Sequence, residues 1–424
     1  MQFLPRILFL LLLLFGIGFF VKNIKRLKRN IQLGKDVYRK DQLKKRWTVM
    51  TLLAFGQSKM VKRPVVGIMH LIVYVGFIII NIEVLEIVLD GLLGTHRLFS
   101  SAGDVYYFLI GSFEVLALLV LLAVIVFWCR RNVLKVKRFW SKEMTSWPKN
   151  DANYILYFEM VLMTLFLIMN ATDVNFQNID SGNPVSQYLY PYFQSLSPST
   201  IHFIERSSWW LHILGILVFL NYLYYSKHLH ILLAFPNTFY SNLEAKGKFV
   251  NNNAVTNEVK TMLDPSADPY AAEAETEAVP ERFGASDVTD LNWVQLMNSY
   301  TCTECGRCSS VCPANQTGKE LSPRSIMMKT RDRLEEVGRN IDANKGTFKE
   351  DGKQLLNDYI TPEELWACTS CNACVEECPV SIDPLSIIMD MRQYLVMEES
   401  SAPQELNMMM TNAVSYTHLR AHET

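Results

Sequence analysis

The chain has 424 residues, half of them hydrophobic, with 41 basic against 42 acidic side chains. A net charge of −1 gives no reason to expect nucleic acid as a partner. Apolar runs concentrate in the first half of the chain and cysteines in the second half. This asymmetry predicts a membrane part followed by a soluble part.

Five apolar stretches are long enough to cross a bilayer, since about 20 helical residues span its ~30 Å hydrocarbon core. The first could instead be a cleaved signal peptide, but it is long for one, and a basic segment rather than a small-residue cleavage site follows it. We expect a membrane domain over 1–240, with spans near 3–21, 65–89, 105–128, 154–169 and 207–234.

Lys and Arg crowd the loops after the first and third stretches, whereas the loops at 90–104 and 171–205 contain few of them. Basic loops remain on the cytoplasmic side of a membrane. The pattern predicts a multi-pass protein of the inner (cytoplasmic) membrane, in contact with lipid. Its N-terminus lies outside, and everything after Ala234 lies in the cytoplasm.

Eight of the nine cysteines fall into two runs of one spacing, C-x2-C-x2-C-x3-C-P, with the second run 66 residues after the first. Proteins that hold two [4Fe–4S] clusters use this run, and the fourth cysteine of each run ligates the other cluster. One predicted ligand set is Cys302, Cys305, Cys308 and Cys378. The other is Cys368, Cys371, Cys374 and Cys312.

Structural zinc is the alternative, because C-x2-C pairs also bind zinc. Two consecutive four-cysteine runs that both end in Cys-Pro favour the clusters. The remaining cysteine, Cys129, is expected to be a free thiol in a reducing compartment. The sequence contains neither a nucleotide-binding fingerprint nor a visible substrate site, so whether the chain is itself an enzyme stays open.

Helices are expected to fill the gap between the runs. Ser322, Thr361 and Asp383 each precede a proline, as an N-cap followed by the first helical position. A further helix is expected from Asp290 to Tyr300, capped by Asp290. The predicted fold is all-α, with a five-helix transmembrane bundle followed by an α-helical ferredoxin domain over 290–400.

Two segments are expected to lie outside these domains. Residues 241–289 are acidic and poor in aromatic residues, which predicts a flexible linker. The tail, 401–424, has no place in either domain, and from Ala413 it resembles translated sequencing-adapter read-through rather than natural protein. An ordinary variable tail is the alternative.

Histidines on the apolar stretches predict a haem. His230 and His212 are 18 residues apart, which on one helix puts them on one face, ~27 Å apart. His70 is expected at the level of His230, so the two could ligate one haem b between them. The alternative interpretation makes His228 and His230 interfacial residues that meet lipid headgroups.

A second haem on His212 would need a partner, and the second stretch offers acids at that level instead of a histidine. Four acids lie in or near apolar stretches, where such residues often mark proton or quinone paths. They are Glu83, Glu86, Glu114 and Glu159. For Glu86, a helix end that reaches the headgroups is the favoured interpretation.

The soluble half, over 290–395, resembles the α-helical ferredoxin module of heterodisulfide reductase, of anaerobic glycerol-3-phosphate dehydrogenase and, more distantly, of succinate dehydrogenase. The shared pattern is the two cysteine runs, Ser322-Pro-Arg324 and Trp366-Ala-Cys368. The membrane half is similar to the cytochrome b subunit of respiratory nitrate reductase and of membrane-bound heterodisulfide reductase. That resemblance implies haem b at His70 and His230.

The chain departs from these families by lacking a second histidine on its second stretch and the cysteine-rich CCG modules. These modules could be lost with the natural C-terminus or supplied by a separate subunit, and a separate CCG-domain subunit is the favoured partner. We expect an electron-transfer subunit that works between a membrane quinol pool (menaquinone or another quinone), haem b, two clusters and a cytoplasmic partner. The alternatives are an iron–sulfur sensor or assembly protein without haem, and a dehydrogenase subunit that acts on a small substrate.

Overall fold

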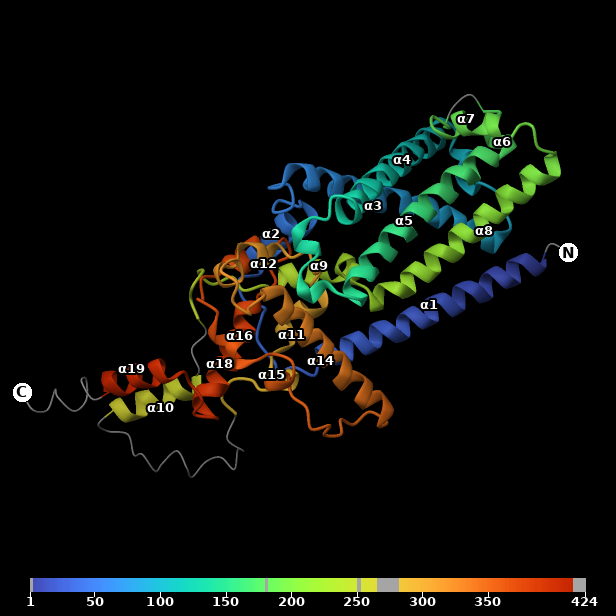
Figure 1. Ribbon diagram of the computed structural model, residues 1–424. Helices are drawn as coiled ribbons and strands as arrows, with labels where there is room; N and C mark the ends of the chain where they lie inside the picture. Colours follow the sequence, from blue (N-terminus) through green and yellow to red (C-terminus); the bar gives the residue numbers. More distant parts are fainter. Residues whose placement is uncertain (1–2, 180–181, 250–252, 265–281, 415–424) are drawn as a thin grey trace, which may run out of the picture.

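The structure is a computed structural model that describes residues 3–179, 182–249, 253–264 and 282–414. Its regular elements are helices, and these described ranges contain no strand. Five long apolar helices lie together at one end of the molecule, and a helical domain lies at the other (Figure 1). The predicted all-α architecture, a five-helix bundle followed by a helical domain, is confirmed.

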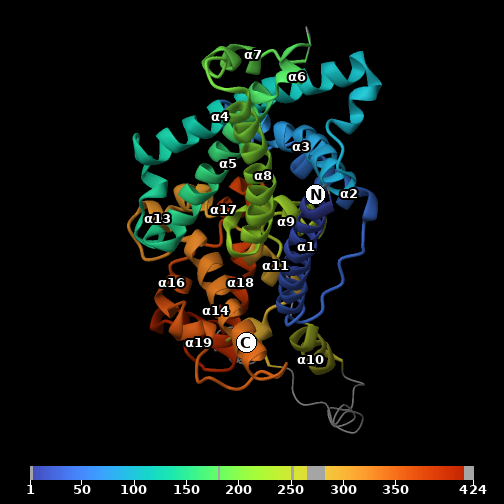
Figure 2. The ribbon, with the colours of Figure 1, turned by 90° about the vertical axis from the view of Figure 1, so that its right-hand side faces the viewer.

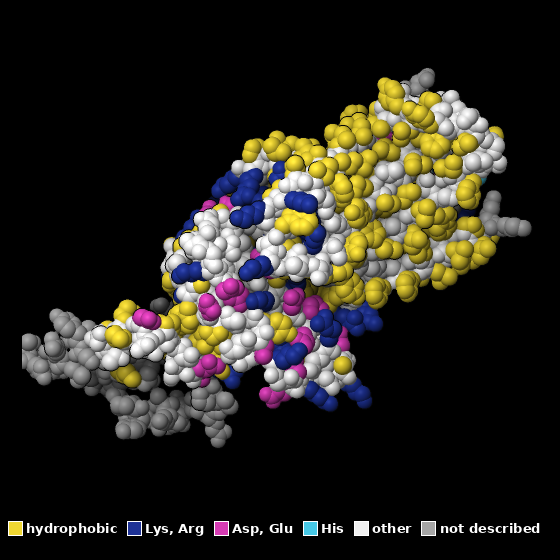
Figure 3. Space-filling model, viewed as in Figure 1, with side chains coloured by type: hydrophobic (Ala, Val, Ile, Leu, Met, Phe, Trp, Pro, Cys, Tyr) yellow, Lys and Arg dark blue, Asp and Glu magenta, His cyan; other side chains and the backbone are white. Residues whose placement is uncertain are grey.

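Each of the five long helices has the length and composition to cross a membrane. On the face of the bundle seen in Figure 3, hydrophobic side chains predominate among the coloured ones, as a surface that faces lipid requires. The helices are α1 (Phe3–Ile31), α3 (Pro64–Leu93), α4 (Asp104–Asn132), α5 (Trp147–Thr172) and α8 (Pro198–Tyr222).

The fifth helix differs from the prediction of one continuous helix over 207–234. Helix α8 begins earlier, at Pro198, and ends at Tyr222. Two 3-10 turns separate it from α9 (His230–Phe239), because Ser226 has extended backbone and its hydroxyl accepts a hydrogen bond from a nearby N–H. Serine favours such local bonds over helix continuation.

This break corrects the histidine geometry expected from the sequence. His212 and His230 lie on different helices, so they do not share one face of a single helix. Pro236 lies inside α9, which ends at Phe239.

Small residues allow the long helices to approach closely. A Cβ atom added to Gly76 on α3 would lie 2.5 Å from the Val120 side chain of α4. One added to Gly215 on α8 would lie 2.8 Å from Leu162 of α5. Such contacts are how helices pack in a membrane, where no hydrophobic effect drives them together.

The soluble domain is built from short helices around α14, and three of its four predicted caps are confirmed. The side chains of Ser322, Thr361 and Asp383 accept hydrogen bonds from backbone N–H groups. The prediction of Asp290 as the fourth cap is wrong, because Asn292 caps the helix that leads into the first cysteine run. The helices are α11 (Trp293–Thr301), α12 (Arg307–Val311), α13 (Pro313–Gln316), α14 (Pro323–Ala343), α15 (Leu355–Asp358), α16 (Pro362–Trp366), α17 (Ala373–Glu377) and α18 (Pro384–Met397).

Helix α1 extends past the bundle and docks on the soluble domain, as Figures 1 and 2 show. The buried Asn30 donates to the Tyr300 hydroxyl at 2.8 Å, and that hydroxyl donates to Glu335 at 2.6 Å. Arg29 donates to the Gly338 carbonyl at 2.9 Å. These bonds join α1 to α11 and α14, so the bundle and the soluble domain are packed against each other.

The predicted linker, 241–289, contains a helix, α10 (Asn253–Leu263), and its residues 250–252 and 265–281 lie outside the described ranges. Helix α19 (Gln404–Val414) reaches the start of the predicted adapter-like tail, and the rest of that tail, 415–424, is also outside them. The remaining short helices are α2 (Leu43–Met50), α6 (Val174–Gln177) and α7 (Ser186–Leu189).

A buried arginine holds the soluble domain together. The Arg333 side chain is fully buried, with Asp287 at 2.8 Å and Asp351 at 2.7 Å. Removal of one partner from a buried ion pair leaves uncompensated charge, which costs about 3–5 kcal/mol. We expect Arg333→Met to lower the domain's unfolding free energy by about that much. Bleaching of cluster absorbance on thermal unfolding would measure it, with the exposed Lys319→Met as the control, and equal unfolding curves would contradict it.

Candidate metal centres

The two cysteine runs fold alike. In each run a loop carries the first two cysteines, and a five-residue helix, α12 or α17, carries the third. The residue before each helix has a left-handed backbone, Gly306 with φ 69° and Asn372 with φ 61°. Glu304 and Ser370, at equivalent positions in the loops, are left-handed as well, with φ 54° and 56°. Because this conformation is uncommon in residues other than glycine, its recurrence marks one structural motif used twice.

The structure gathers the first three cysteines of the first run with the last cysteine of the second run. Burial, and next the charges of Cys302, Cys305 and Cys378, raise the pKa of the Cys308 thiol well above its ordinary value. Burial raises the pKa of Cys302 to about 12 and that of Cys378 to about 11, and the charge of Cys305 adds to both. These four thiols form one neighbourhood, which we call the first cysteine group.

The other four thiols form the second cysteine group. Burial raises the pKa of Cys374 to about 12, with further contributions from Cys368 and Cys312. Burial also raises the pKa of Cys368, with contributions from Cys312 and Cys371. Each run thus places its fourth cysteine beside the other run. These groups have the membership predicted for the two clusters, and iron ligation itself stays a prediction.

The two groups differ in exposure. Cys371 of the second group is exposed, whereas each cysteine of the first group is buried or half-buried. Within the described ranges, no three His, Cys, Asp or Glu side chains come close enough together to hold a single metal ion. Thiolates around a four-iron cluster stand further apart than thiolates around one ion, so this spacing is compatible with the cluster.

His70 on α3 and His230 at the start of α9 face each other, with ring centroids 6.4 Å apart. Two imidazoles that ligate one metal ion with bonds of about 2 Å have centroids about 6 Å apart. Nδ1 of His230 lies 3.1 Å from the Lys227 carbonyl, a hydrogen bond that leaves Nε2 free to ligate. Nδ1 of His70 is buried and has no hydrogen-bond partner among the described residues. The pair therefore fits bis-histidine ligation of a haem.

The other two histidines are placed differently from their prediction. His228 stacks on His230 with centroids 5.5 Å apart, because the segment is a 3-10 turn rather than an α-helix. His212 is buried, and its Nδ1 lies 3.1 Å from the Leu162 carbonyl, which also leaves Nε2 free. Phe166 packs against its ring, and among the described residues no histidine ring opposes it, so it supplies one candidate ligand.

The first cysteine group is bonded to the segment that leads into α3, the helix that carries His70. Arg307, between Cys305 and Cys308, donates to the Lys59 carbonyl at 3.2 Å, just before α3 begins. The sequence offered no signal for this arginine, because its contact crosses 248 residues.

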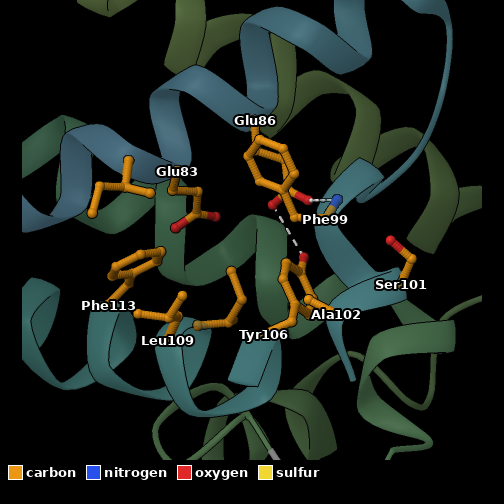
Figure 4. Close-up of a pocket in the computed structure, with 10 residues that line it drawn as sticks. Glu83, Glu86, Phe99, Ser101, Ala102, Tyr106, Leu109 and Phe113 are labelled. Carbon is orange, nitrogen blue, oxygen red and sulfur yellow. Dashed lines mark hydrogen bonds between the residues drawn. The ribbon is translucent and has the colours of Figure 1, made fainter. Parts of the chain in front are cut away.

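A cavity of about 250 Å³ lies between α3 and α4, at the end of the bundle away from the soluble domain (Figure 4). Its wall includes Phe113 and Leu109, and two acids of α3 line it. Glu86 accepts hydrogen bonds from the Phe99 N–H at 2.8 Å and the Tyr106 hydroxyl at 3.1 Å. Glu83 is only 4% exposed, points into the cavity, and has one oxygen without a partner in the described part of the chain.

The acids predicted from the sequence thus have different environments. Glu86 is buried and hydrogen-bonded, so its prediction as a headgroup-reaching residue is wrong. Glu114 is buried and fully occupied: it accepts from Asn170 at 3.0 Å and from the N–H groups of Val185 and Ser186 at 2.9 Å. It anchors a loop, which leaves Glu83 as the acid in the cavity with an unused oxygen.

Residues 301–382 match the family described as "4Fe-4S dicluster domain". This part of the chain, which we call the dicluster domain, is similar to that family. The match spans both cysteine runs and the helices between them, and it supports iron–sulfur clusters as the cofactors of the dicluster domain.

The chain is also similar to curated proteins over most of its length. It is 28% identical to the probable iron-sulfur-binding oxidoreductase FadF of Bacillus subtilis (strain 168), over 96% of this chain and 58% of that protein. It is 24% identical to the EtfAB:quinone oxidoreductase of Syntrophomonas wolfei, over 89% of this chain and 52% of that protein. The chain therefore spans little more than half the length of these two relatives.

A third relative matches a smaller share of the chain. It is a protein of Archaeoglobus profundus that is named for its likeness to a heterodisulfide reductase subunit. The chain is 29% identical to it, over 30% of this chain and 55% of that protein. This confirms the resemblance to heterodisulfide reductase for the soluble half. No solved structure matches the chain.

Proposed function

We propose that the chain is a membrane-anchored electron-transfer subunit that passes electrons between a membrane quinol pool and a redox partner in the cytoplasm. The observation that carries the proposal is the packing of the first cysteine group against α9 and against the end of the bundle that faces the soluble domain. Lys59 donates to the Cys378 carbonyl at 3.3 Å, and Asn237 of α9 donates to the Val380 carbonyl at 2.8 Å. A redox centre in that group would lie beside one held by His230.

Two [4Fe–4S] clusters, one in each cysteine group, are the proposed soluble centres. Such clusters supply one-electron transfer when bound. Cys371 of the second group is exposed, whereas each cysteine of the first group, next to the membrane part, is buried or half-buried. Electrons would therefore enter and leave at different ends of the pair. The contact between α12 and α17, which carry Cys308 and Cys374, supports two adjacent groups.

One haem b between His70 and His230 is the proposed membrane centre. The 6.4 Å ring separation and the hydrogen bond that orients His230 support it. His212 is oriented in the same way, but the residues around it supply no second histidine, so we propose one haem.

We further propose that the quinone ring binds in the cavity between α3 and α4. The cavity is apolar and partly open, since Ile82 at its rim is exposed toward the lipid-facing side. An unused carboxyl oxygen of Glu83 is available to accept a hydrogen bond from a quinol hydroxyl. Glu83 and His70 are 13 residues apart on α3, ~20 Å along its axis, so binding and electron delivery can be tested separately.

Glu83→Leu tests the quinone site. We expect quinol-dependent reduction of the clusters to slow at least about tenfold, because the hydrogen bond from a quinol hydroxyl is lost. Reduction by dithionite, which needs no quinone site, should be unchanged. Glu159→Leu removes another buried acid outside the cavity and serves as the control. Equal quinol-dependent rates in wild type and Glu83→Leu would move the quinone site elsewhere.

The cytoplasmic partner is proposed from the resemblance to heterodisulfide reductase and from the names of two relatives. A CCG-domain subunit is expected from the resemblance to heterodisulfide reductase, and EtfAB is the partner in the name of the Syntrophomonas protein. The distribution of Lys and Arg supports a cytoplasmic location for the dicluster domain in an inner membrane.

The experiment that tests the proposal is anaerobic purification from membranes, followed by optical and paramagnetic spectroscopy before and after addition of a quinol. We expect two cluster signals and a b-type haem, all reducible by quinol. Clusters without haem would favour the sensor or assembly protein. Zinc in place of iron would overturn the cluster assignment itself.

A further inference from the structure

A buried carboxylate distinguishes the first cysteine run from the second. Glu304 lies between Cys302 and Cys305 and is 3% exposed, whereas the equivalent residue of the second run is Ser370. A buried carboxylate is costly unless cations compensate it. Its charge also acts on the Cys302 thiol, which places it beside the first cysteine group.

Two cations from distant parts of the chain meet this carboxylate. Arg331 of α14 donates to one oxygen of Glu304 at 2.6 Å, and Lys227 donates to the other. The Lys227 ammonium group also donates to the Pro148 carbonyl at 2.6 Å. Asp151 accepts from the Lys227 backbone N–H at 3.0 Å. Lys227 is thereby fixed at the start of α5 as well as at the cysteine loop.

The same lysine also contacts the proposed haem ligand. The Lys227 carbonyl is the hydrogen-bond partner of His230 Nδ1, at 3.1 Å. A hydrogen bond to the remote nitrogen of a ligating histidine fixes the ring orientation and raises its basicity. One residue therefore joins the loop of the first cysteine group through its side chain and His230 through its main chain.

From this arrangement we infer that Lys227 and Glu304 are positioning residues that couple the two redox centres, an inference that rests on the proposed function. Together they fix the distance between His230 and the first cysteine group. Their charges also set the reduction potential of the first cluster separately from the second. A negative charge beside a cluster disfavours the added electron, and a positive charge favours it.

Glu304→Gln and Lys227→Met test the two parts of the inference in the full-length protein. Redox titration with paramagnetic detection should show the first cluster's potential raised in Glu304→Gln and lowered in Lys227→Met, with the second cluster unchanged. Flash-induced electron transfer from the haem to the clusters should slow at least tenfold in Lys227→Met. The His230 hydrogen bond uses the main chain, so the haem spectrum should be retained, and Lys227→Arg should restore the rate.

The outcomes separate this inference from the proposed function. The redox titration of Glu304→Gln measures the reduction potentials of the clusters alone. It therefore tests the inference even if the protein lacks haem. Unchanged potentials in both variants would overturn the inference while leaving the electron-transfer function intact. Equal shifts of both clusters would also overturn it, because they would mark a general loosening of the domain. Ser370→Ala, at the equivalent position of the second run, is the matched control and should leave the first cluster's potential unchanged.

Discussion

Replacement of Cys312 by serine is expected to remove the cluster of the second cysteine group, although Cys312 belongs to the first run. Its charge acts on the thiols of Cys368 and Cys374, which places it with them. Loss of one of four thiolate ligands should lower the iron content from about eight to about four per chain. Iron analysis and paramagnetic spectroscopy of the purified protein would measure this.

Double variants decide which cluster is lost. Cys312→Ser combined with Cys371→Ser should lose no more iron than either change alone, because both remove the same cluster. Cys312→Ser combined with Cys305→Ser should lose both clusters. The reverse result would show that each run ligates its own cluster. Cys129→Ser, which lies on α4 outside both groups, is the control and should keep all the iron.

Replacement of either His70 or His230 by alanine is expected to abolish the b-type haem spectrum. The two rings face each other at 6.4 Å and come from different helices, so neither can be replaced by a neighbour on its own helix. Quinol-dependent reduction of the clusters should fall at least about 100-fold, since one ligand of a bis-histidine site is gone. Reduction by dithionite should persist, and optical difference spectra would measure both effects.

His202→Ala serves as the control, because His202 is exposed on α8 far from the pair. His228→Ala addresses the stacked neighbour and should shift the haem spectrum without abolishing it. Loss of haem in His228→Ala but not in His70→Ala would reassign the ligand. A wild-type protein without haem would contradict the membrane centre altogether.

The sequence by itself determined the features that depend on local spacing or on length. Five apolar runs of helical length predicted the bundle, because each span satisfies its own backbone hydrogen bonds. Cysteine spacing predicted the dicluster domain, and a capping residue before proline predicted the starts of three helices. The sequence also predicted that His70 pairs with His230, because both were expected at the same depth in the membrane.

Tertiary structure alone decided which groups meet across long distances. Ser226 breaks the last apolar helix, so His228 joins His230, and His212 is left on another helix. Glu304 and Lys227 are 77 residues apart, and neither carries a local signal that the other is its partner. Local rules fail here because a buried charge is stabilised by whichever counter-charge the packing brings to it, and packing is a property of the whole chain.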